Sequence, residues 1–249
     1  VISSEKISIG PPFYHKLIIP FLIPFLLLMA LGPKLDWIKN KKIELKFIKI
    51  IFLILSVIIA FLIARNLNTK ILYLTSLISV ALYLFFISII DLKNKKLKLS
   101  QKISHLAFSI LIVSIILNSV FSEEVSVNLK TGEQKKISNY IIKFESITSE
   151  EINNYTSLKA EIRVIQNDNM LKFYPELRLY KVPETITSEA DIKTNLFNDN
   201  FVVVNYLKDT DYLNIRYQKK PFMLLIWLSA LMLAIGGTAG LRKKNLNEN

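Results

Sequence analysis

The sequence contains no cysteine and only two histidines, His15 and His105. The absence of thiols excludes disulfides, thiolate zinc sites, iron–sulfur clusters and cysteine nucleophiles. Two histidines are also too few for a site built from several histidines of this chain. No basic segment or small-residue cleavage site precedes the first apolar run, and the sequence begins at Val1. We therefore expect no signal peptide, and expect the sequence to be a piece of something longer.

Acidic residues are fewer than basic ones, 20 against 32, which gives a net charge of +12. This excess is unevenly placed, because residues 122–219 hold 13 Lys and Arg against 15 Asp and Glu, a net of −2 that leaves +14 for the rest. The remaining basic residues flank apolar runs. Such a distribution is typical of membrane-flanking loops and does not favour nucleic acid as a partner.

Five apolar runs are long enough to cross a membrane, at about 16–31, 47–64, 71–90, 103–121 and 221–241. The sequence therefore predicts a bundle of five transmembrane helices: four spans within residues 1–121, and a fifth span with a basic tail within 220–249. Pro20 and Pro24 are expected to kink the first span. Because lipid cannot satisfy the freed carbonyls, this span is expected to pack inside the bundle.

The basic loops predict the orientation of the bundle. The loops after spans one and three and the carboxyl-terminal tail hold five, five and three basic residues, whereas the turn after span two holds two. Lysine and arginine near span ends stay on the cytoplasmic side. We therefore expect the amino terminus outside, residues 122–219 outside, the carboxyl terminus inside, and His105 in the cytoplasmic half of the fourth span.

Residues 122–219 are predicted to form an extracytoplasmic all-β domain inserted between spans four and five. Alternating or apolar runs, with a turn signal at 131–133, predict strands at 125–130, 136–147, 157–165, 171–181, 201–206 and 212–217. Short strands at this spacing are typical of a small sandwich or a partly open barrel. The acidic residues gather neither with histidine nor with a glycine-rich phosphate loop, so the domain is expected to bind or brace and not to catalyse.

His105 is the candidate functional residue, because an ionisable side chain inside a span is costly. The alternative is a histidine hydrogen-bonded to a neighbouring helix. No carboxylate lies near His105 in sequence, so axial ligation of haem iron by a neutral imidazole suits it better than proton transfer. His15 lies beside Phe13 and Tyr14 at the outer end of its span and is expected to be interfacial. Most of a ~30 Å hydrocarbon core separates it from His105, so it is not expected to be a second ligand.

Five segments in order resemble the carboxyl-terminal part of the cytochrome c-type biogenesis family CcmF. They are ISIGPPFYHKLIIPFLIPFLLLMALGPKLDW (7–37), SHLAF (104–108), NLKTGEQKKISNYIIKF (128–144), YPELRLYKVPETITSEADIKTN (174–195) and YQKKPFMLLIWLSALMLAIGG (217–237). The resemblance implies the last part of a membrane haem lyase of the inner membrane, bacterial or mitochondrial, which attaches haem covalently to apocytochrome c. It also implies the partners: the amino-terminal portion of the same haem lyase, the haem chaperone, apocytochrome c with its thioredoxin-like and chaperone delivery subunits, and membrane lipid.

By the same resemblance His105 matches a family histidine in an HLG-like motif, an axial ligand of haem b; here the motif reads His105-Leu106-Ala107. The family's tryptophan-rich WWD segment and its other haem-ligating histidines have no counterpart. The chain alone is therefore not expected to be an active enzyme.

Other matched positions imply structural roles. Gly236 and Gly237 match a glycine pair that we interpret as close helix packing, and Trp227 is expected to pack or to lie at the membrane interface. The family's outer turn is matched by Gly10, Pro11 and Phe13. Its inner turn is matched by Gly32, Pro33 and Trp37.

Two other functions stay open on sequence grounds. One is a non-catalytic membrane scaffold whose outer β domain docks cytochrome maturation partners. The other is a fragment of a transporter, which would need paired broken helices, whereas Pro20 and Pro24 supply only one break.

Overall fold

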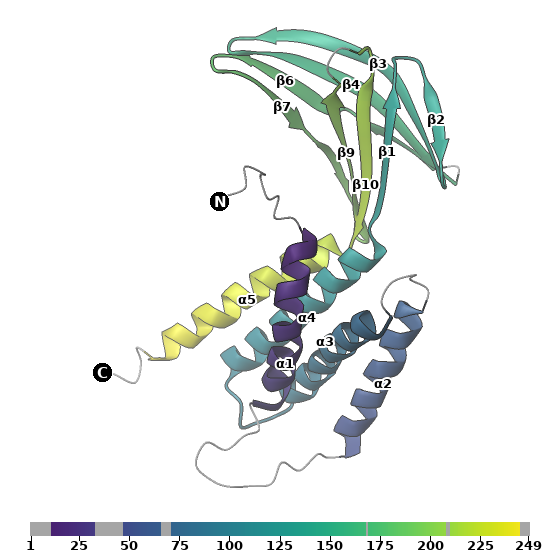
Figure 1. Cartoon of the computed structure of the whole chain (residues 1–249). Coiled ribbons are helices and arrows are strands. Elements are labelled where there is room, and N and C mark those ends of the chain that lie inside the picture. The colour runs from purple at the N-terminus through teal and green to yellow at the C-terminus, as the bar shows by residue number, and fades with distance from the viewer. Residues whose placement is uncertain (1–10, 33–46, 66–70, 168, 208–209, 245–249) are drawn as a thin grey trace, which may run out of the picture. The chain divides into compact units, whose positions relative to one another are not determined.

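The computed structural model describes residues 11–32, 47–65, 71–167, 169–207 and 210–244. The chain divides into two compact units, residues 1–116 with 225–249, and residues 117–224 (Figure 1). The first unit is helical. The second unit holds all ten strands of the described residues, the last turn of one helix and the start of another.

The helices are α1 (Pro11–Leu31), α2 (Phe47–Ala64), α3 (Ile71–Leu92), α4 (Leu99–Phe121) and α5 (Met223–Lys244). Four of them contain stretches long and apolar enough to cross a membrane: Phe47–Ala64, Leu72–Leu92, Leu99–Phe121 and Met223–Leu241; in α1 the apolar stretch Leu17–Leu31 is shorter. The predicted helical bundle with an inserted β domain is therefore confirmed, with one helix for each predicted span.

Helix α3 is the most buried of the four longer apolar helices, with half of its apolar window buried against 11–22% in α2, α4 and α5. Helix α2 packs with its small residues inward, since Ser56, Ala60 and Ala64 are fully buried. The rings of Phe52 and Phe86 stack across the α2–α3 contact at 5.1 Å. Small side chains allow two helix backbones to approach closely, which stabilises helix pairs in lipid.

Helix α1 continues through Pro20 and Pro24. It packs against α3, meets α4 at Phe108 and buries Leu26 and Ala30, whereas Phe21 and Leu28 are 72% and 63% exposed. The expectation that this span lies inside the bundle is therefore not met within the described residues. The predicted outer turn is wrong for Pro11 and Phe13, which lie in the first turn of α1. A proline is tolerated there because the first amides of a helix have no intrahelical acceptor. Gly10, Pro33 and Trp37 lie outside the described residues.

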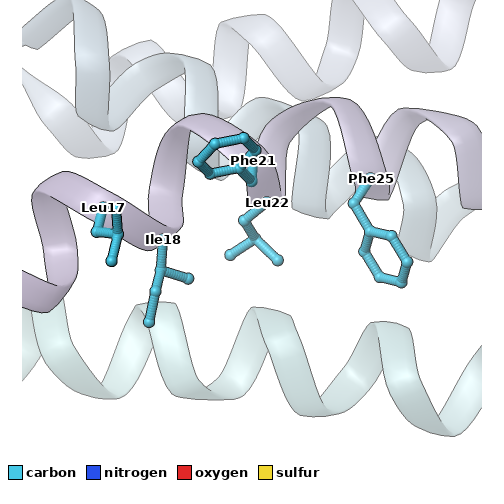
Figure 2. A pocket seen from close by; sticks show the side chains of 5 residues that line it. All are labelled: Leu17, Ile18, Phe21, Leu22 and Phe25. Carbon is cyan, nitrogen blue, oxygen red and sulfur yellow. The ribbon is translucent and has the colours of Figure 1, made fainter.

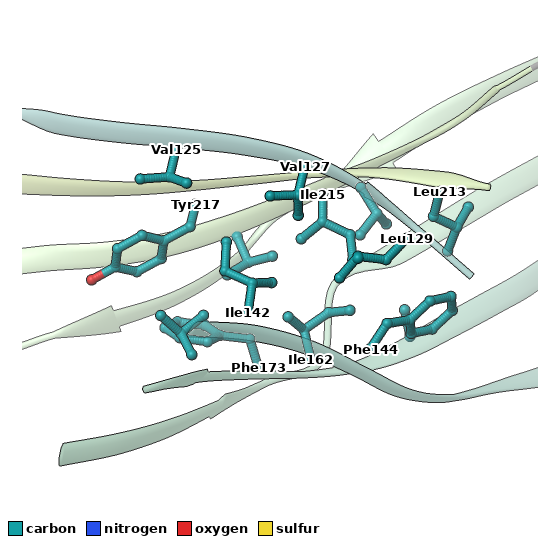
Figure 3. Close-up of a cluster of buried hydrophobic side chains, with 14 of the residues drawn as sticks. Val125, Val127, Leu129, Ile142, Phe144, Ile162, Phe173, Leu213, Ile215 and Tyr217 are labelled. Atoms are coloured by element: carbon teal, nitrogen blue, oxygen red, sulfur yellow. The ribbon is translucent and has the colours of Figure 1, made fainter. Parts of the chain in front are cut away.

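The second unit is an antiparallel two-sheet sandwich. One sheet has the order β1-β10-β9-β8; the other has the order β2-β3-β4-β6-β7, with β5 also paired to β4. The strands are β1 (Glu123–Leu129), β2 (Gln134–Ile137), β3 (Tyr140–Ile152), β4 (Tyr155–Gln166), β5 (Asn169–Phe173), β6 (Glu176–Lys181), β7 (Glu184–Glu189), β8 (Asp191–Thr194), β9 (Asn198–Tyr206) and β10 (Leu213–Pro221). Alternate residues of both sheets face each other and form the core (Figure 3).

Two of the predicted strands are each interrupted in the structure, and two of the observed strands were not predicted. Residues 136–147 form the end of β2, a turn with Ser138 at φ 50°, and most of β3. Residues 171–181 break at Tyr174–Pro175 between β5 and β6. Strand β7 is exposed along almost its whole length, and β8 has only four residues, so neither shows the alternation of buried positions by which a strand is predicted.

Two tyrosines place hydroxyl groups in the sandwich core. The Tyr140 hydroxyl donates to Glu123 Oε2 at 2.7 Å, and the Tyr217 hydroxyl donates to Asn200 Oδ1 at 2.9 Å. Burial raises the pKa of Tyr217 to about 12. Burial, with the bond to Glu123, also raises the pKa of Tyr140 above its usual range. Both hydroxyls are therefore held in the protonated form.

This arrangement predicts a loss of stability at alkaline pH. The unfolded chain releases the Tyr217 proton near pH 10.0, whereas the folded chain keeps it up to about 12. The contribution is therefore complete below pH 10.0 and falls through that window by about 1.4 kcal/mol per pH unit. Urea unfolding of the chain, followed by near-ultraviolet circular dichroism from neutral pH to about 11, measures this slope. Because Tyr140 contributes to the slope in the same direction, Tyr217→Phe should reduce it by about half and Tyr217→Phe with Tyr140→Phe should flatten it further. An equally steep slope in the single variant would contradict the assignment.

Candidate functional site

His105 lies near the start of α4 and is partly buried. Two hydrogen bonds join this part of α4 to the end of α3: Ser88 Oγ donates to the His105 carbonyl at 3.4 Å, and Lys102 Nζ donates to the Leu92 carbonyl at 2.9 Å. Asp91, only 7% exposed, lies on the same turn of α3. The carboxylate of Asp91, which is 14 residues from His105 in sequence, therefore lies on the turn of α3 that contacts His105. Inspection of the sequence around His105 missed this carboxylate.

An apolar groove of about 420 Å³ runs along α1, lined by Leu17, Ile18, Phe21, Leu22 and Phe25 (Figure 2). All five side chains are aliphatic or aromatic, so no lining side chain can form a hydrogen bond. The ring of Phe25 meets that of Phe108 edge to face at 6.3 Å. Phe108 lies three residues after His105 on α4, so Phe25, one of the groove residues, contacts α4 about one helical turn from the histidine.

The Phe25–Phe108 contact also sets the level of the two histidines. His15 precedes Phe25 by ten residues, about 15 Å of helix, and His105 precedes Phe108 by three, about 4.5 Å. Because α1 and α4 run in roughly opposite directions (Figure 1), these distances add to about 20 Å along the helix axes. Nitrogens bound to one metal ion lie on the order of 2 Å from it. This separation agrees with the expectation that His15 is not a partner of His105; the His15 side chain lies outside the described residues.

Helices α4 and α5 meet through small residues beside His105. A Cβ added to Gly236 would overlap Ser104 Oγ and lie 2.9 Å from the Ser104 backbone nitrogen, and one on Gly240 would lie 3.6 Å from Ser100. The two contacts are four residues apart on each helix, which defines a small-residue seam of Ser100, Ser104, Gly236 and Gly240. The predicted close packing is confirmed for Gly236. It is wrong for Gly237, which has no heavy atom within 4 Å of an added Cβ.

The remaining predicted positions on the helices are more exposed. Trp227 on α5 is 67% exposed and Gly32 is exposed at the end of α1. An exposed indole on a helix long enough to span a membrane is consistent with a lipid or interface position.

Charged groups of the β unit form ion pairs. Glu145 Oε1 forms ion pairs with Lys143 Nζ at 3.0 Å and with Arg163 Nε at 3.1 Å, and Lys143 lowers the pKa of this carboxyl. Arg178 and Glu176 pair at 3.1 Å. Among the residues that the structure describes, no group of three or more His, Asp or Glu side chains is placed to hold a metal ion.

His105 and the apolar side chains of α1 can be tested for their fit to haem separately, because the groove is lined by α1 residues alone. Haem iron takes a neutral imidazole nitrogen as an axial ligand, and apolar side chains can pack against the faces of the macrocycle. His105 supplies one such donor.

Known proteins match both the helices and the sandwich of this chain. A family model described as the CcmF C-terminal beta-sandwich matches residues 120–221, the span of the two-sheet unit. The chain matches the carboxyl-terminal portion of the CcmF family. The cytochrome c-type biogenesis protein CcmF of Haemophilus influenzae is 27% identical over 251 residues, and that of Escherichia coli K12 is 25% identical over 245 residues. Each alignment covers 93% of this chain, and 38% and 37% of the respective relatives.

A solved structure titled cytochrome c heme lyase CcmF has the same fold, with a TM-score of 0.71 at 15% identity over 91% of this chain and 40% of that one. The chain thus spans less than half the length of the CcmF proteins that it matches. Both the helices and the sandwich take part in the match, because the aligned share exceeds nine-tenths of the chain.

Proposed function

We propose that this chain is the carboxyl-terminal part of a membrane haem lyase that acts in cytochrome c maturation, attaching haem covalently to apocytochrome c. The observation that carries the proposal is the CcmF match over 93% of the chain, which includes both units. The proposed location is the inner membrane, with the β unit on the periplasmic side, because the basic loops flank the other ends of the helices.

Within this function we propose that His105 is one axial ligand of haem b. Bound haem supplies one-electron chemistry at its iron. The neutral imidazole of His105 donates a nitrogen, and the apolar side chains of the α1 groove keep water from that side. The backbone bond from Ser88 and the small-residue seam hold α4 at a fixed distance from α3 and α5, which orients the histidine.

The second ligand and the pocket for the substrate haem are assigned to the amino-terminal portion of the same haem lyase. The other proposed partners are the haem chaperone, and apocytochrome c with its thioredoxin-like and chaperone delivery subunits. The β unit is suited to docking one of these proteins, because it has exposed edge strands such as β7. This observation favours the alternative too, a non-catalytic scaffold that docks maturation partners.

Haem binding separates the two functions. The chain is co-expressed with the amino-terminal portion of a CcmF relative, and the purified complex is examined by reduced-minus-oxidised absorption spectroscopy. We expect a haem b spectrum that His105→Ala abolishes and that His15→Ala leaves unchanged. His105→Gly should recover part of the spectrum when imidazole is added, which a merely structural histidine would not do. A full haem b spectrum in His105→Ala would contradict the ligand assignment, and recovery of partner proteins without any haem would favour the scaffold.

A further inference from the structure

The turn between β8 and β9 exposes two large apolar side chains. Leu196 is 76% exposed and Phe197 is 79% exposed. Both side chains lie outside the buried core of this unit, and adjacent exposed apolar side chains of this size are candidates for a contact surface. We name Asn195, Leu196 and Phe197 the β8–β9 tip.

Hydrogen bonds define the conformation of the tip. The Asn195 side-chain oxygen accepts from the backbone amides of Phe197 and Asn198, each at 2.9 Å, and the Asn195 amide donates to the Asn198 carbonyl at 3.0 Å. These bonds use only backbone groups of Leu196 and Phe197. Both apolar side chains are therefore held outward by a turn to which they contribute no packing.

The tip lies beside the chain's two connections to apolar helices. The Phe222 amide donates to the Phe197 carbonyl at 3.0 Å, and Phe222 immediately precedes α5. The Phe222 ring lies 6.5 Å from that of Phe121, the last residue of α4. The Asn118 side chain donates to the Pro221 carbonyl. All these residues belong to the unit 117–224, so the tip has a fixed place next to the ends of two helices that are long enough to cross a membrane.

Basic residues lie in the strand rows next to the tip. Lys219 and Lys193 both pair in register with Asn200, and Lys220 pairs with Asp199. All three lysines are partly exposed. Aromatic and aliphatic side chains next to lysines, level with a helix end, are the composition of a membrane–water interface.

We propose that the β8–β9 tip is a membrane-interface anchor, with Leu196 and Phe197 inserted between lipid headgroups beside the outer ends of α4 and α5. The occupant is the lipid surface because the tip is bonded directly to the residue before a membrane-crossing helix, at the level where the chain leaves the hydrocarbon. Such an anchor would fix the tilt of the β sandwich on the bilayer. The proposal goes beyond haem ligation and does not depend on it.

The absence of cysteine gives a clean background for the test. The full chain carrying Phe197→Cys is spin-labelled and reconstituted alone in nanodiscs of phosphatidylcholine and phosphatidylglycerol. We expect the label to collide severalfold more with oxygen than with a water-soluble nickel chelate, as a lipid-embedded label does. Val182→Cys is the matched control, since Val182 is an apolar residue, 90% exposed, in the turn between β6 and β7. Its label should be fully accessible to nickel.

Equal nickel accessibility at positions 197 and 182 would overturn the proposal. Protection at 197 that depends on protein concentration would overturn it as well, because it would indicate a second copy of the chain as the partner. If the Phe197 variant does not fold, Leu196→Cys supplies the same readout, since its side chain makes none of the turn's bonds. Neither measurement uses haem, so a failure here is distinct from a failure of the haem lyase assignment.

Discussion

Replacing Gly236 by leucine is expected to separate α4 from α5 and destabilise the helical unit. A Cβ at this position would lie 2.9 Å from the Ser104 backbone nitrogen, and a backbone atom cannot rotate away as a side-chain hydroxyl can. Overpacking of this kind costs about 1–3 kcal/mol or more. Thermal unfolding of the detergent-solubilised chain, followed by size-exclusion chromatography of the heated samples, measures the loss.

Gly237→Leu is the matched control for this prediction. It makes the same change one residue along α5, where an added Cβ has no heavy atom within 4 Å, so its midpoint should stay near that of the unchanged chain. Ser104→Ala in the Gly236→Leu background should rescue only part of the loss, because it removes the hydroxyl and leaves the backbone nitrogen in place. Equal midpoints for the two glycine variants would show that the small-residue seam does not hold α4 and α5 together. If His105 binds haem, the haem content of the co-expressed complex should fall with Gly236→Leu alone.

The two glycines show where reasoning from sequence ends in the helical unit. Hydropathy is a property of consecutive residues, so the five runs predicted the five helices, with boundaries off by a few residues. Which glycine faces a neighbour depends on the rotation of α5 about its axis and on the partner that it meets. Both are set by packing between helices, so Gly236 and Gly237 were not distinguishable before Ser104 was seen against one of them.

The environment of His105 was also predicted only in part from the sequence. The cost of an ionisable group in an apolar run marks the histidine from sequence alone. The Ser88 bond, the buried Asp91 and the α1 groove come from segments between 14 and about 90 residues away, and no local pattern reports them.

In the β unit, alternation found the strands that contribute to the core and missed those that do not. Over part of β3, β4, β9 and β10, fully buried positions alternate with partly buried ones, which is the signal that the sequence shows. Strands β7 and β8 bury almost nothing and are held by backbone pairing to β6 and β9. Backbone pairing leaves no mark on side-chain composition, so these strands require the structure.

Phe173→Ala is expected to destabilise the β unit more than any single change on its surface. Phe173 is fully buried, and its ring lies 6.2 Å from that of Tyr217, across the two sheets. Truncation of a buried phenylalanine costs about 3–5 kcal/mol, a large share of the roughly 5–15 kcal/mol that stabilises a domain. Urea-dependent hydrogen exchange of the full chain in nanodiscs, read by mass spectrometry on peptides of β3 and β4, reports the loss for this unit alone.

Phe197→Ala is the matched control, because it makes the same change at a side chain that is 79% exposed and makes no core contact in the described unit. Its backbone carbonyl still accepts from the Phe222 amide, so the tip should keep its shape and the exchange midpoint should stay near that of the unchanged chain. A midpoint lowered as much by Phe197→Ala as by Phe173→Ala would mean that Phe197 packs into the fold, and would remove the basis for placing it in lipid. A loss confined to Phe173→Ala would show that the stability of the sandwich resides between its sheets, which leaves Phe197 free to act at the membrane surface.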